Sequence, residues 1–135
     1  MLKDIARDNY QNGYNCAEAM LLAGNEYYNL HLNPDTFKVM AGFGGGVGVE
    51  DLCGVVSGSV ALLGIIFVDK RAYESQEIKE ITEDFVESFR RELKTLNCKM
   101  LKDMYREEDA KCSSVVEAGG RVLEEVIIKY KSKSK

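Results

Sequence analysis

IKEITEDFVESFRRELKTL, residues 78–96, carries the clearest structural signal in the chain. Its apolar residues recur at steps of three and four, separated by charged residues: Ile78, Ile81, Phe85, Phe89, Leu93 and Leu96. This spacing places the apolar side chains on one face of an α-helix. We therefore predict a long amphipathic helix here, with its apolar face packed against other helices.

The rest of the chain also favours helices. Helical patterns cover residues 3–12, 15–28, 51–67, 98–104 and 115–127, and Pro34 favours the start of a further helix. Only one proline, Pro34, is present, and runs of β-branched residues are brief. We predict a compact all-α bundle of five to six helices. Residues 1–130 would form a single helical domain, and residues 131–135 would form a disordered basic tail.

Length and composition limit the classes of protein to which the chain can belong. The chain has 135 residues, 45% of them hydrophobic and 30% charged, which is typical of a globular domain with its own core. The net charge of −4 argues against nucleic-acid binding. The longest apolar stretch, residues 55–68, is too short to span a bilayer, and the first residues lack a secretory signal pattern. These features predict a cytoplasmic protein that does not insert into membranes.

Glycine is concentrated before and within one predicted helix. Residues 42–48, GFGGGVG, lack both the Gly-Lys-Ser/Thr ending of a phosphate loop and the third glycine of a dinucleotide-binding motif. A tight connection between helices is the favoured interpretation, although Gly44, Gly45 and Gly46 are also candidates for a ligand-binding loop. Gly54 and Gly58 are further candidates for such a site. Their spacing along a helix also predicts close packing against a neighbouring helix.

Four cysteines are the candidate catalytic residues. Each follows closely after a residue type that caps helices: Asn15 before Cys16, Asp51 before Cys53, Asn97 before Cys98 and Asp109 before Cys112. A thiol at a helix N-terminus feels the positive end of the helix dipole, which stabilises the reactive thiolate. No pair has the Cys-x-x-Cys spacing, so a common site would have to be assembled by the fold.

Three functions remain open at this point. In the first, the four cysteines form a thiol/disulfide redox site without a cofactor, acting on an unknown redox partner or small molecule. Cys53 would be the most reactive thiol, because the glycine segment leaves its helix start open, and Lys99 and Lys111 adjoin other cysteines. In the second, Cys16, Cys53, Cys98 and Cys112 bind zinc or an iron–sulfur cluster. In the third, the chain is a structural helical interaction module. A homodimer is compatible with the glycine-lined helix.

The cysteine pattern resembles the C_GCAxxG_C_C family of small helical redox-active proteins. That family shares four cysteines and a Cys-Gly-Ala-x-x-Gly motif, which here is Cys53-Gly54-Val55-Val56-Ser57-Gly58, with valine in place of alanine. Asn15-Cys16-Ala17 and the glycine segment also match. The resemblance implies a redox role for the cysteines. A similar domain occurs in split-Soret cytochromes, but the haem attachment motif is missing here, so only the iron–sulfur cluster carries over as an implication.

Overall fold

The computed structural model describes residues 1–133, and within them the chain forms seven α-helices. They are α1 (Leu2–Gln11), α2 (Cys16–Tyr27), α3 (Asp35–Lys38), α4 (Gly54–Phe67), α5 (Glu77–Leu93), α6 (Cys98–Tyr105) and α7 (Ser113–Lys133). Three shorter helical turns are η1 (Ala41–Phe43), η2 (Gly46–Glu50) and η3 (Ala72–Glu74). The predicted all-α fold is confirmed. The predicted count of five to six is too low, because the four-residue α3 is a separate, seventh helix.

Helix α5 is the amphipathic helix predicted from its spacing. Ile81, Phe85, Phe89 and Leu93 are buried on its inner face, and the Phe85 and Phe89 rings lie 6.1 Å apart. The helix ends before Leu96, because Lys94 adopts a left-handed conformation with φ of 78°. The apolar pattern therefore continues past the end of the helix into the loop before α6.

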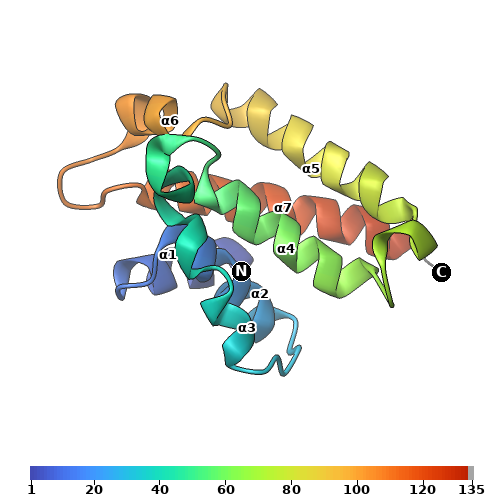
Figure 1. Cartoon of the computed structure of the whole chain (residues 1–135). Coiled ribbons are helices and arrows are strands. Elements are labelled where there is room, and N and C mark those ends of the chain that lie inside the picture. Colours follow the sequence, from blue (N-terminus) through green and yellow to red (C-terminus); the bar gives the residue numbers. More distant parts are fainter. Residues whose placement is uncertain (134–135) are drawn as a thin grey trace.

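Helices α4 and α7 form the centre of the molecule. α7 packs against α1, α5 and α4, while α4 also packs against α2 and α5 (Figure 1). A buried carboxylate joins three of these helices. Glu124 of α7 accepts a hydrogen bond from the Leu2 backbone N–H at 3.2 Å and another from the Tyr27 hydroxyl at 3.0 Å. This pairing fixes the first turn of α1 and the end of α2 on α7.

Close packing of α2 on α4 is confirmed at the glycines of α4. A Cβ atom at Gly58 would clash with the Ala17 backbone, and one at Gly54 would clash with the Cys16 sulfur. Gly24 of α2 is packed in the same way against the Leu62 side chain of α4. The two helix backbones therefore approach one another where the first two cysteines lie.

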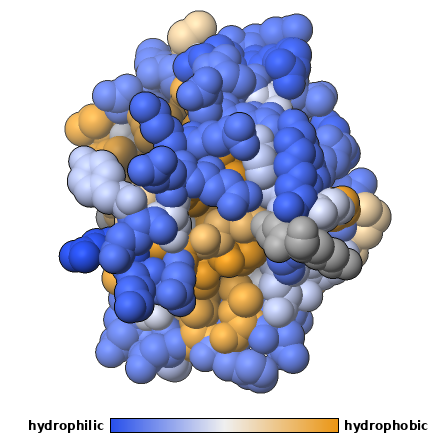
Figure 2. Space-filling model, turned by 90° about the vertical axis from the view of Figure 1, so that its right-hand side faces the viewer, coloured by the Kyte–Doolittle hydropathy of each residue, from blue (hydrophilic) through white to orange (hydrophobic). Residues whose placement is uncertain are grey.

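The surface is mostly polar. Figure 2 shows a band of apolar side chains between polar ones on the end of the molecule where α4 finishes and α5 begins. Among residues 1–133, no helix combines the length and apolarity needed to cross a bilayer. Helix α7 continues to Lys133, so residues 131–133 are helical where a disordered tail was expected, because the apolar stripe of α7 extends to buried Tyr130. Residues 134–135 lie outside the described part.

Candidate functional site

Two of the four cysteines are the first residues of asparagine-capped helices, as predicted. Asn15 precedes Cys16 in α2, and its side-chain oxygen accepts the Glu18 backbone N–H at 2.9 Å. The Glu18 carboxylate in turn accepts the Asn15 backbone N–H at 2.9 Å, which completes a capping box. Asn97 precedes Cys98 in α6 and accepts the Met100 backbone N–H at 3.0 Å.

The other two cysteines lie immediately before their helices. Cys53 is itself the N-cap of α4, and Cys112 directly precedes Ser113, the first residue of α7. The prediction that Asp51 restarts the helix is wrong, because its backbone is non-helical, with φ of −93° and ψ of −115°. The carbonyl of Cys112 accepts the backbone N–H groups of the first turn of α7.

A short antiparallel backbone pairing brings Cys53 and Cys98 together. The Cys53 N–H donates to the Leu96 carbonyl at 2.9 Å, and the Cys98 N–H donates to the Asp51 carbonyl at 2.6 Å. Between these bonds, Leu52 pairs with Asn97. The starts of α4 and α6 therefore lie side by side although their cysteines are 45 residues apart.

All four cysteines line one cavity of about 150 Å³. The other residues around it are Tyr10, Asn15, Gly45, Val55, Leu101, Lys102, Arg106 and Val115. Four helix starts thus meet at one cavity, with three aliphatic side chains, from α4, α6 and α7, and two cationic side chains in its wall. The cavity has room for a sulfur atom and a few neighbouring atoms of a substrate, but a drug-sized ligand needs about 300 Å³ or more.

The glycine segment packs against the starts of α2 and α6. Gly45 lines the cavity in a left-handed conformation, with φ of 64°, and its backbone hydrogen-bonds the Cys16 thiol. A Cβ atom at Gly46 would lie 2.6 Å from the Cys98 Cβ. One at Gly44 would lie 2.5 Å from the Asn15 side-chain nitrogen. The segment is thus a tight connection, as favoured from sequence, and only Gly45 borders the cavity.

Burial dominates the electrostatics of Cys53. Its side chain is 6% exposed, and burial, with smaller contributions from the Cys16 and Cys98 sulfurs, raises the pKa of its thiol to about 12. The backbone N–H groups of Val55 and Val56 act in the opposite direction, although no side-chain capping hydrogen bond forms. The prediction that Cys53 is open to a partner is therefore wrong.

Burial also raises the pKa of two other thiols. At Cys16 the Cys112 sulfur adds to the effect of burial, while the Gly45 backbone hydrogen bond opposes it. At Cys98 burial again raises the pKa, and the Lys102 ammonium opposes it. For these two thiols and Cys53, desolvation of the charged form outweighs the helix dipole that motivated the prediction of stabilised thiolates.

Cys112 has different surroundings. Its side chain is only half-buried, and the Arg106 Nη1 atom lies 4.0 Å from its sulfur. The Cys112 backbone N–H donates to the Tyr10 hydroxyl at 3.2 Å, and the same hydroxyl hydrogen-bonds the Cys112 side chain. Burial raises the pKa of Tyr10, and the Cys112 and Cys16 sulfurs raise it further, so Tyr10 keeps its proton and can donate it in a hydrogen bond.

A comparison with known protein families agrees with this cysteine arrangement. Residues 14–126 match the sequence profile of a family described as "Putative redox-active protein (C_GCAxxG_C_C)". The chain belongs to the C_GCAxxG_C_C family. No curated protein and no solved structure matches the chain.

The position where this C_GCAxxG_C_C protein departs from the family motif, Val55, is accommodated by a glycine on the facing helix. Val55 is buried and lines the cysteine cavity. A Cβ atom at Gly119 of α7 would clash with the Val55 side chain. The absence of a side chain at Gly119 therefore leaves room for the bulk that valine adds beside Cys53.

Sequence reasoning missed Tyr10, Lys102 and Arg106 as parts of the site. Lys102 could have been found, because it lies four residues after Cys98 on the same face of α6. Tyr10 is 102 residues away from Cys112 in the sequence. Arg106 follows the last residue of α6 and begins the loop before Cys112. No local pattern therefore identifies either residue. The suggested Lys99 pairs with Asp103 at 3.9 Å and does not line the cysteine cavity.

The cysteines do not fit the zinc or iron–sulfur alternative. In the part of the chain that the structure describes, which includes all four cysteines, no group of three His, Cys, Asp or Glu side chains is arranged to hold a metal ion.

Proposed function

We propose that the protein is a thiol–disulfide redox protein whose four cysteines form one site. The observation that carries this proposal is that four thiols from four distant helix starts line a single small cavity. Buried cysteines that served only as core residues would not need to share a cavity wall with Arg106, Lys102 and Tyr10. The family description, which names redox activity, agrees with this function.

Cys112 is proposed as the attacking thiol and Cys16 as the thiol that resolves the intermediate. Both are half-buried, whereas Cys53 and Cys98 are buried. The Arg106 guanidinium and the Tyr10 hydroxyl are placed to hold negative charge on the Cys112 sulfur. The Cys16 sulfur raises the pKa of Cys53, Cys98 and Tyr10, and the Cys112 sulfur raises the pKa of Cys16. Cys16 therefore interacts with each of the other three thiols, which gives it a central position among them.

The reaction then follows ordinary disulfide exchange. The Cys112 thiolate attacks one sulfur of a substrate disulfide, forming a mixed disulfide and releasing the other sulfur as a thiolate that takes up a proton. The Cys16 thiol loses its proton and attacks the Cys112 sulfur, which releases the second substrate thiol. The substrate disulfide is reduced to two thiols, and the protein is oxidised to a Cys16–Cys112 disulfide.

Mapping the oxidised cysteines tests this function. We expect the protein, equilibrated in dithiothreitol buffers of increasingly oxidising ratio, to form one disulfide between Cys112 and Cys16, read by alkylation and peptide mass spectrometry. Cys53 and Cys98 should remain thiols. A Cys112→Ser variant should lose this transition, and the matched Cys98→Ser variant should keep it. A protein that forms no disulfide, or one only between Cys53 and Cys98, would contradict the proposal.

A second expected result concerns Tyr10. A Tyr10→Phe variant removes the hydroxyl that bonds both the backbone and the side chain of Cys112. Alkylation of Cys112 by iodoacetamide should slow by about tenfold, the value of one lost hydrogen bond to a charged group. Peptide mass spectrometry gives the rate for each cysteine separately.

Tyr14→Phe is the matched control for Tyr10→Phe, because Tyr14 follows the same helix and is 46% exposed. It should leave the Cys112 rate unchanged, and neither variant should slow the other three cysteines. Equal slowing of all four thiols in Tyr10→Phe would show a general structural effect instead.

A further inference from the structure

A second pocket adjoins the cysteine cavity on the outer side of Tyr10. It has a volume of about 530 Å³ and is lined by Tyr10, Gln11, Gly13, Tyr14, Asp109, Ala110 and Lys111. Tyr10 belongs to the walls of both spaces, and Cys112 follows Lys111 directly in the chain. A molecule in the outer pocket therefore contacts Tyr10, whose hydroxyl hydrogen-bonds the thiol proposed to attack.

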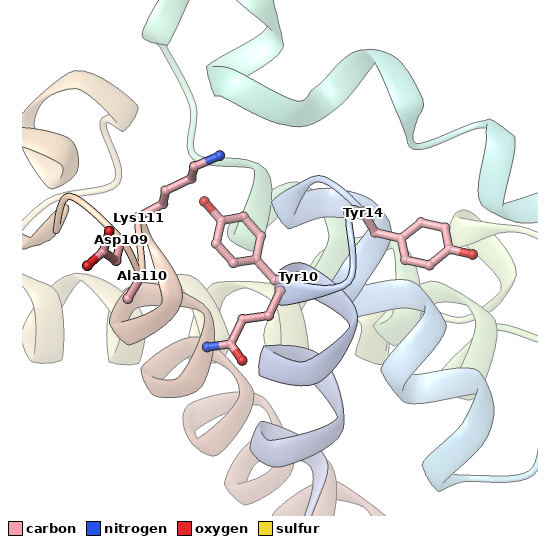
Figure 3. Close-up of a pocket in the computed structure, with 7 residues that line it drawn as sticks. Tyr10, Tyr14, Asp109, Ala110 and Lys111 are labelled. Atoms are coloured by element: carbon pink, nitrogen blue, oxygen red, sulfur yellow. The ribbon is translucent and has the colours of Figure 1, made fainter.

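The outer pocket offers unpaired charges of opposite sign. Lys111 and Asp109 are both exposed, and neither has an ion-pair partner within residues 1–133. Figure 3 shows the Lys111 and Tyr10 side chains leaning toward one another from neighbouring elements, with the Asp109 carboxylate turned to the other side of the loop and Tyr14 pointing away. An ammonium and a carboxylate at one pocket are complementary to a ligand that carries both charges.

The loop that carries these charges is held firmly. The backbones of Glu107 and Lys111 exchange two hydrogen bonds of 2.9 Å, which close a tight turn around Asp109. The Ser113 hydroxyl donates to the Ala110 carbonyl at 2.6 Å and accepts from the Gln11 side chain at 3.3 Å, which ties the loop to the end of α1. The charges and Cys112 are thus presented on a fixed framework.

The two volumes indicate how a substrate would divide between the spaces. The outer pocket, about 530 Å³, is within the range of small-molecule sites. The inner cavity, about 150 Å³, admits only the reacting sulfur and its neighbours. A small disulfide with charged ends could place an end in the outer pocket and its sulfur at Cys112.

We propose that the pocket formed by Tyr10, Gln11, Asp109 and Lys111 binds the charged end of a small zwitterionic disulfide of the amino-acid type. Lys111 binds the carboxylate, Asp109 binds the ammonium group, and the disulfide sulfur reaches Cys112. This inference rests on the proposed disulfide exchange and adds its substrate class. Cys112 attacks the disulfide, Cys16 completes the exchange, and the substrate leaves as two thiols with a Cys16–Cys112 disulfide formed.

Three synthetic disulfides test the roles of the two charges separately. 3,3′-Dithiodipropionate carries only carboxylates, cystamine carries only ammonium groups, and hydroxyethyl disulfide is neutral. The reduced protein is mixed with each probe, and formation of the Cys16–Cys112 disulfide is followed in a single turnover. Lys111→Gln should slow the reaction with dithiodipropionate about threefold to fivefold, and Asp109→Asn should slow cystamine by a similar factor. Cystine should be slowed by each variant, and hydroxyethyl disulfide by neither.

Lys99→Gln and Asp103→Asn are the matched controls, because they make the same charge changes on exposed side chains of α6, outside the pocket. They should not distinguish between the probes. Equal effects of Lys111→Gln and Asp109→Asn on all three probes, or no effects, would overturn the pocket assignment while leaving disulfide exchange intact. A faster reaction with a protein disulfide, insensitive to both variants, would also overturn it. Failure of every disulfide to form the Cys16–Cys112 bond would overturn the proposed function as well.

Discussion

A Gly58→Ala variant should lose about 2–3 kcal/mol of unfolding free energy, as expected for a side chain forced into a closely packed interface. The added Cβ atom would clash with the backbone carbonyl oxygen of Ala17, and a backbone atom cannot rotate away as a side chain can. Helices α2 and α4 would have to separate. Urea unfolding under reducing conditions, followed by circular dichroism, measures the difference.

Gly64→Ala is the matched control, because Gly64 lies on the same helix and its added Cβ would have no atom within 4 Å apart from the adjoining backbone of that helix. There the substitution should stabilise the protein by about 0.5–1 kcal/mol, since alanine favours a helix more than glycine does. Equal effects of the two substitutions would mean that helix propensity alone sets the change in stability, and that α2 does not depend on Gly58 for its position.

The glycine spacing also has a consequence for the redox site. Gly54 lies one turn before Gly58 on α4, and a Cβ atom there would clash with the Cys16 sulfur. The two glycines therefore set how closely α2 approaches α4, and with it how closely Cys16 approaches Cys53. The family motif places its cysteine at the N-cap of α4 and its two glycines on successive turns of that helix, where this approach matters.

Much of the fold could be predicted from local patterns. The spacing of apolar residues identified α5, because its inner face is buried along its whole length. The asparagines before Cys16 and Cys98 identified two helix starts, because capping depends on residues within one turn. The count of helices was too low because α3, with four residues, is too short to show a helical period.

The site was only partly predictable, because burial depends on tertiary packing. The dipole at a helix start is a local property, and it favoured reactive thiolates at all four cysteines. The structure buries Cys53 under the starts of several helices, and desolvation then outweighs the dipole. The pairing of Leu52 with Asn97 and the contact of Tyr10 with Cys112 join residues far apart in sequence, so no spacing rule predicts them.

Alkaline pH should destabilise the native protein through Cys53 by roughly 2–3 kcal/mol between about pH 8 and pH 11, since one pKa unit corresponds to about 1.4 kcal/mol. Burial raises the pKa of this thiol from 9.0 to about 12 on folding. The folded state therefore favours the protonated thiol, and this contribution is fully present below the unfolded pKa. It is lost as the pH rises towards the folded pKa, because the unfolded chain releases its proton first.

A Cys53→Ala variant isolates this contribution. Burial also raises the pKa of Cys16, Cys98 and Tyr10, so both proteins should lose stability in alkali, and the difference between them reports Cys53. At about pH 8 the free energy of unfolding of the variant should be lower than that of the unsubstituted protein, because the substitution leaves a small cavity. By about pH 11 this deficit in unfolding free energy should shrink or reverse. Val56→Ala, a buried change without a titrating group, should show a constant deficit across the same range.

The result decides which thiol can begin the chemistry. If the deficit of Cys53→Ala falls with pH as expected, Cys53 holds its proton throughout the range in which disulfide exchange operates, and a protonated thiol is a poor nucleophile. Attack then belongs to a thiol with cationic and hydrogen-bonding neighbours, which is the situation of Cys112 beside Arg106 and Tyr10. A deficit that stayed constant with pH would show that Cys53 ionises as readily in the folded protein as in the unfolded chain, and the attacking role would return to it.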